Sequence, residues 1–113
     1  MLPRQNRLKE KLDFDNIFKN GRKISTPFFL FAYIKSNPEK PTLIGIVASK
    51  KVGGAVQRNR AKRILRVASR KILEKYPKGL NISIVANSSV LKLSSAELEQ
   101  EICNQILSRA LIE

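Results

Sequence analysis

Histidine is absent from the 113-residue sequence, and cysteine occurs once, as Cys103. Without histidine, the common Ser-His and Cys-His nucleophile pairs, histidine-centred acid/base catalysis and ordinary Cys/His zinc sites are all excluded. A lone cysteine forms no intramolecular disulfide, and Cys103 lies in an apolar helical pattern where we expect a small, buried or half-buried thiol. A self-sufficient hydrolase is therefore not expected.

Long apolar runs are missing as well. The longest covers residues 28–34, which is far short of the roughly 20 residues that cross a membrane. The first residues also lack the apolar stretch of a secretory signal. We therefore expect a cytoplasmic protein that does not span a membrane.

Acidic residues are scarce, with 9 against 22 lysines and arginines, which gives a formal net charge of +13. The hydrophobic fraction of 42% is enough for a folded core, and the length suits a single domain over residues 1–113. Because such a charge works against the compact state by self-repulsion, it is best explained by a polyanionic partner, with nucleic acid as the first choice.

This charge is distributed unevenly along the chain. Residues 1–78 carry a net charge of +15, whereas residues 79–113 carry −2. The binding surface is therefore predicted to come from the first two thirds of the sequence.

Hydrophobic periodicity divides the chain into helices and strands. Helical spacing occupies residues 9–20, 56–76 and 95–111, and β-branched and aromatic residues concentrate in residues 27–35, 42–49 and 80–86. We expect the first two strands to pair across a turn between them. The order helix, strands, helix, strand, helix predicts one α+β domain, an α/β sandwich that contains a strand-helix-strand unit.

The last helix has the clearest start signal. Ser94 and Glu97 fit the capping box, and Leu93 and Leu98 occupy the positions of a hydrophobic staple. Acidic residues in the first turns complement the helix dipole. We interpret this helix as structural.

The middle helix concentrates the basic residues. On a helical wheel its apolar residues, among them Ala61, Leu65 and Ala68, share one face. The residues on the opposite side are Asn59, Lys62, Arg63, Arg66 and Arg70. Solvated faces usually mix charges of both signs, whereas residues 50–78 hold 11 basic residues and one acid. The predicted RNA-binding residues are Lys50, Lys51, Arg58, Asn59, Arg60, Lys62, Arg63, Arg66 and Arg70.

These residue types suit a ribose-phosphate chain. Arginine binds phosphate with its planar fork and stacks on bases, and the amide of Asn59 can contact a base, sugar or phosphate. Two lysines and the Gly53-Gly54 turn precede the helix. That turn is either an anion-binding nest or a plain flexible turn, because it lacks the glycine and lysine spacing of nucleotide-binding loops.

Aromatic residues alternate along the first predicted strand. Phe29, Phe31 and Tyr33 share one face, and Leu30 and Ala32 share the other. One face packs on the core, and the other is free to offer stacking platforms to bases. The alternation does not fix which face is which.

The basic segment closely resembles the signature of a known family, the bacterial ribonuclease P protein components. The resemblance is carried by residues 49–56, by Arg58-Asn59-Arg60, by Lys62-Arg63 and by Arg66. Arg7-Leu8, Phe14, Ile17-Phe18 and Gly21 also fit the first helix of that family. The order of elements agrees too, so the resemblance covers most of the chain.

The resemblance implies a left-handed crossover between the parallel strands that flank the basic helix. It also implies that the chain is the protein subunit of a tRNA-processing endonuclease, in which an RNA subunit uses Mg²⁺ for phosphodiester hydrolysis. The protein then binds this RNA and the 5′ leader of precursor tRNA and has no catalytic residue of its own. By position, the leader cleft maps to Phe14, Phe18, Phe29, Phe31 and Val47.

Other functions are compatible with the charge alone. A general RNA-binding protein of ribosomal or chaperone type is the main alternative, and a self-contained nuclease is disfavoured because no base is available. Asp13 and Asp15 are not expected to hold a metal together, since residues two apart on a helix do not face each other. A membrane-surface role is disfavoured because the apolar stripe of the middle helix is needed for the core.

Overall fold

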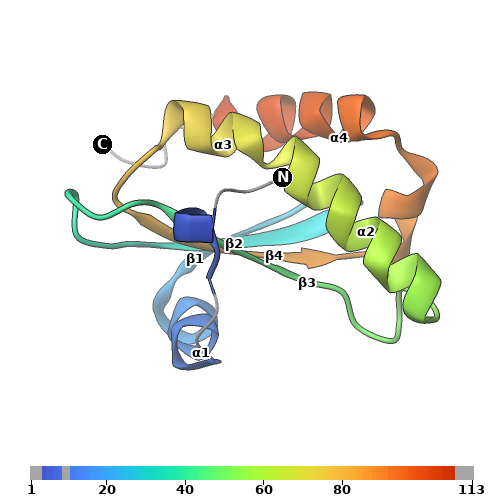
Figure 1. The fold of residues 1–113 in the computed structure, drawn as a ribbon, viewed down its shortest axis with the longest axis horizontal. Helices are drawn as coiled ribbons and strands as arrows, with labels where there is room; N and C mark the ends of the chain where they lie inside the picture. The colour runs from blue at the N-terminus through green and yellow to red at the C-terminus, as the bar shows by residue number, and fades with distance from the viewer. Residues whose placement is uncertain (1–3, 9–10, 109–113) are drawn as a thin grey trace.

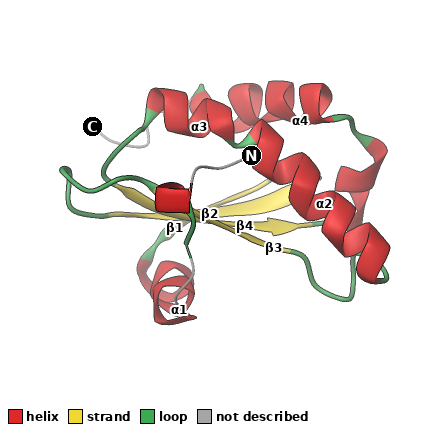
Figure 2. Ribbon diagram, viewed as in Figure 1, coloured by secondary structure: helices red, strands yellow, loops and turns green. Residues whose placement is uncertain are grey.

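A four-stranded sheet with helices on both faces forms the protein (Figure 1). This computed structural model describes residues 4–8 and 11–108. The strands are β1 (Arg22–Ser25), β2 (Phe29–Lys35), β3 (Leu43–Val47) and β4 (Leu80–Ala86), and the helices are α1 (Lys11–Asn20), α2 (Ala55–Ala68), α3 (Arg70–Lys75) and α4 (Ser95–Ile102). Figure 2 shows α1 on one side of the sheet and α2, α3 and α4 on the other. The predicted α+β class and order of elements are confirmed.

The strand order is β1-β2-β4-β3, so the expected pairing of β2 with β3 is wrong. β4 lies between them and pairs antiparallel with β2 and parallel with β3. The segment at residues 36–41 is bonded to the start of β4, since Ser36 N donates to Gly79 O at 2.9 Å and Gly79 N donates to Lys40 O at 3.1 Å. It therefore crosses the end of β4 and does not close a hairpin.

Two local features differ from the sequence-based expectation. The edge strand β1 carries little signal because Ile24 is its one apolar residue, although it pairs in register with Phe31 of β2. The long middle helix is divided into α2 and α3 at Ser69, which is buried and donates its hydroxyl to Leu65 O at 2.5 Å. A serine bonded back onto the preceding turn bends a helix in this way.

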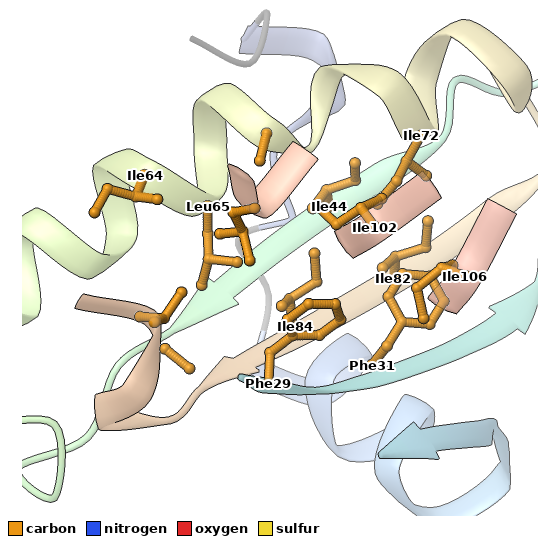
Figure 3. Close-up of a cluster of buried hydrophobic side chains, with 14 of the residues drawn as sticks. Phe29, Phe31, Ile44, Ile64, Leu65, Ile72, Ile82, Ile84, Ile102 and Ile106 are labelled. Carbon is orange, nitrogen blue, oxygen red and sulfur yellow. The ribbon is translucent and has the colours of Figure 1, made fainter. Parts of the chain in front are cut away.

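The main core lies between the sheet and the helices α2, α3 and α4. Figure 3 shows Phe29 and Phe31 among the side chains of this cluster, near Ile82, Ile84 and Ile106. A smaller cluster covers the opposite face of the sheet under α1, and its members are Leu8, Ile17 and Ala32 with Phe14, Phe18, Ile34 and Leu43 packed against them. The alternation along β2 therefore divides its residues between two cores.

The start of α4 follows the predicted capping box. Ser94 Oγ accepts from Glu97 N at 3.1 Å, and the Glu97 carboxylate accepts from Ser94 N at 3.1 Å. The α-helix ends at Ile102 and continues as a π-helical turn over Cys103–Leu107. The last predicted helical residues, 109–111, lie outside the described residues, as do residues 9–10 of the first helix. None of the described helices has the length and apolarity to cross a membrane.

Candidate nucleic-acid interface

Helix α2 is oriented by its apolar stripe. Ala61, Leu65 and Ala68 are fully buried, so the opposite face of the helix must turn to solvent. Of the predicted RNA-binding residues on the helices, Asn59, Arg60, Arg63, Arg66 and Arg70 are exposed, and Arg58 and Lys62 are half-buried. The sequence-based assignment of the two faces is therefore confirmed.

Most of these cations have no carboxylate partner. Among the side chains that the structure describes, in residues 5–8 and 14–108, the ion pairs join Arg70 to Glu99 at 3.7 Å and Lys71 to Glu74 and Glu99 at 3.4 and 3.9 Å. The arginines of α2 make no ion pair there, and their mutual repulsion is not offset. Arg70, on α3, differs from them because a carboxylate of α4 faces it. We call Arg60, Arg63 and Arg66 the arginine stripe.

The loop before α2 presents two further cations. Lys50 and Lys51 are exposed, and the loop is closed by bonds from Val52 N to Ser49 O at 3.0 Å and from Gly53 N to Lys50 O at 3.2 Å. Gly53 has φ of 147°, a left-handed conformation that favours glycine. The turn therefore needs its glycine for backbone geometry, whether or not it also binds an anion.

On the α1 face of the sheet, three apolar side chains lie next to one another on neighbouring strands. Ala32 packs under α1, so Leu30, two residues away on β2, is on the same face. Gly45 of β3 contacts Phe14, which places Val47 on that face as well. Both Leu30 and Val47 are register partners of Val85, and all three are half-buried. We call Leu30, Val47 and Val85 the apolar strip.

Two of the predicted cleft residues are not in this region. Phe29 and Phe31 are 0% exposed and lie on the opposite face of the sheet, in the main core (Figure 3). Their assignment to the cleft is wrong, because in a strand neighbouring residues alternate between faces and these two face the main core on the side of α2, α3 and α4. Leu30 and Val85 lie on the α1 face instead. The alternation along β2 placed Leu30 on the face opposite Phe29 and Phe31, which was the signal available in the sequence.

A hollow of about 160 Å³ lies between the α1 face of the sheet and the arginine stripe. Its lining residues are Arg7, Leu8, Phe14, Ile44, Gly45, Ile46 and Arg66. The Phe14 ring packs directly on the backbone of β3, since a Cβ added to Gly45 would overlap Cζ of Phe14. We call this the Arg66 hollow, whose lining includes both an exposed arginine and an aromatic ring.

A second hollow, of about 630 Å³, lies at the other end of the apolar strip. It is lined by Pro27, Ser49, Lys51, Val85, Ala86, Asn87, Ser88 and Ser89. Hydroxyl, amide and ammonium groups converge there, although the Ser89 hydroxyl donates to Pro27 O at 2.6 Å. We call it the Lys51 hollow. Sequence reasoning identified Lys51 and missed the serines and Asn87, which carry no charge signal.

Comparisons with known proteins agree on one family. The family model for Ribonuclease P matches residues 2–110. The chain is 41% identical over 102 residues to the ribonuclease P protein component of Nitratiruptor sp., covering 90% of this chain and 89% of that protein. Over 104 residues it is 34% identical to the component of Symbiobacterium thermophilum, covering 92% and 90%.

Solved structures of the same family share the fold. The RNase P protein from Thermotoga maritima superposes with a TM-score of 0.76 at 26% identity, covering 92% of this chain and 97% of that one. The RNase P protein from Staphylococcus aureus superposes with a TM-score of 0.75 at 25% identity, covering 91% and 94%.

Proposed function

Because this chain belongs to the ribonuclease P protein component family, we propose that it binds the 5′ leader of precursor tRNA across the α1 face of its sheet. The leader path runs from the Arg66 hollow over the apolar strip to the Lys51 hollow. Membership of the family makes the RNA subunit of ribonuclease P its partner. The observation that carries the proposal is the position of Arg66, which belongs to the arginine stripe and lines the same hollow as the ring of Phe14.

The two sides of this path suit the two parts of a nucleotide. Arg63 and Arg66 are exposed and have no carboxylate partner among the described residues, so they are available to phosphate. Phe14 and Phe18 are partly exposed and four residues apart on α1, where they can stack on successive bases. Stacking on an aromatic side chain contributes about 1–3 kcal/mol per base and tolerates any sequence.

We assign the hydrolytic step to the RNA subunit and its Mg²⁺. Among the residues that the structure describes, no three histidine, cysteine, aspartate or glutamate side chains lie together as a possible metal site. The sequence also lacks histidine as a general base. The role of the protein is then to lower the repulsion between leader phosphates and the catalytic RNA, which raises precursor affinity and helps to retain the metal ions.

The test is to reconstitute the protein with a bacterial ribonuclease P RNA and to measure kcat/KM for two precursors. One carries a long 5′ leader and the other a leader shortened to one nucleotide. We expect the protein to stimulate cleavage of the long-leader precursor about tenfold more, which corresponds to about 1.4 kcal/mol. Equal stimulation of both precursors would contradict leader binding, and no stimulation of either would favour a general RNA-binding protein.

A further inference from the structure

A second group of cations lies at the end of the sheet opposite the start of α2. Lys35 ends β2, Lys40 precedes β3 and Lys78 precedes β4, and all three are exposed. Hydrogen bonds hold their backbones together, since Gly79 N donates to Lys40 O at 3.1 Å and Pro41 forms a β-bridge with Lys78. We call Lys35, Lys40 and Lys78 the lysine end.

This cluster carries an excess of positive charge. Glu39 is the one acidic residue in residues 35–41 and 75–80. No ion pair to a carboxylate engages any lysine of the cluster within the described part of the chain. The neighbouring Lys75 is different, because its ammonium donates to Leu107 O and lies 5.6 Å from the centre of the Tyr76 ring. Three ammonium groups are therefore left for an external anion.

The lysine end lies away from the leader path. The molecule measures 37 Å along its longest axis. In Figure 1 the loops of the lysine end are at the left, and the loop that leads into α2 is at the right. Phosphates of one strand in a duplex follow each other about every 3.4 Å along the helix axis, so a phosphate bound at one end is several nucleotides from a phosphate bound at the other.

We propose that the lysine end binds the phosphate backbone of a second RNA segment, so that the protein bridges two parts of the ribonucleoprotein. Lysine is a point charge on a flexible stem and fits phosphate contacts that carry no sequence information. A lipid surface fits less well, because the one large, well-exposed hydrophobic side chain among the described residues is Val56, on α2. The identity of the RNA rests on the proposed function.

The first arm of the test measures how salt affects binding of the full chain to ribonuclease P RNA. In the variant K35Q/K40Q/K78Q, the slope of log affinity against log salt is expected to fall by about 2 to 3, because each lysine–phosphate pair contributes about 0.7–0.9 to it. The control K19Q/K23Q/K92Q removes the same charge from exposed lysines elsewhere and should leave the slope nearly unchanged. An equal fall in both variants would overturn the proposal, because it would indicate net charge alone.

The second arm locates the RNA segment that each end of the protein approaches. An iron chelate is attached to Pro38→Cys, near the lysine end, or to Gln57→Cys on α2, each in a Cys103→Ser background, and hydroxyl radicals from the iron then cut nearby RNA. We expect the two probes to cut separate segments of the RNA subunit. If the α2 probe alone cuts, RNA binding by the lysine end is refuted and the proposed function stands. If neither probe cuts, both proposals fail. A third outcome would identify a membrane, and not RNA, as the partner of the lysine end. In that case the Pro38 probe does not cut, the parent chain binds phosphatidylglycerol vesicles, and the triple variant does not bind them.

Discussion

Phe29→Ala is expected to destabilise the folded protein by about 3–5 kcal/mol, the usual cost of removing a fully buried phenylalanine. The ring is 0% exposed and packs between β2 and the helices on the α2 face, in the same cluster as Ile84 and Ile106. Its removal leaves a cavity in the main core, and the cavity adds to the lost transfer free energy. Because the residue is not on the leader path, the folded fraction should bind leader as the parent does.

The measurement is urea unfolding combined with leader binding, with Phe18→Ala as the matched variant. Phe18 is half-buried on the other face of the sheet, so its truncation should cost less stability and weaken leader binding, by about 1–3 kcal/mol per base that it stacks. If Phe29→Ala does not fold, Phe29→Leu retains most of the volume and keeps the comparison possible. A leader-specific loss in Phe29→Leu with unchanged stability would restore Phe29 to the cleft.

The double variant R63A/R66A is expected to show the largest loss of RNA affinity. Both guanidinium groups are exposed on α2, and Arg66 also lines the hollow that contains Phe14. Charge-assisted hydrogen bonds contribute about 1.5–3 kcal/mol each, so the loss of two lowers affinity by about a hundredfold or more. The fold should be retained, because neither side chain belongs to the core.

Salt dependence separates this effect from a general change in charge. In the double variant the slope of log affinity against log salt should fall by about 1.4–1.8, which corresponds to two phosphate contacts. The control R22A/K23A removes two exposed cations from the edge strand β1 and is expected to keep most of the slope. An R63A/R66A slope equal to that of the parent would remove the arginine stripe from the interface.

Local patterns were sufficient to predict most elements and which face of α2 is buried. The capping box at Ser94 and Glu97 depends on residues three apart, and the face of α2 depends on the spacing of Ala61, Leu65 and Ala68. Such short-range signals are encoded directly in the sequence. The structure confirms these elements, although their ends are shifted by a few residues. The middle helix is also divided at Ser69, where the serine hydroxyl bonds back to Leu65 O.

The strand order and the cleft depend on contacts between distant segments. Nothing local in β2 or β3 indicates that β4 lies between them, since that order follows from the crossover through α2 and α3. The cleft assignment failed for a related reason. The alternation along β2 gave two faces correctly, but only tertiary packing decides that Phe29 and Phe31 join the main core while Ala32 joins the smaller cluster under α1.

The position of the leader in the assembled enzyme is the most direct test of the binding surface. A precursor tRNA with a photoreactive nucleotide in its leader is cross-linked within the reconstituted ribonucleoprotein, and the modified peptide is identified by mass spectrometry. We expect cross-links on α1 at Phe14 or Phe18, on β3 at Val47, or on α2 at Arg66. Cross-links confined to the outer face of α4, or none to the protein while leader-dependent stimulation persists, would contradict a leader path on the α1 face of the sheet.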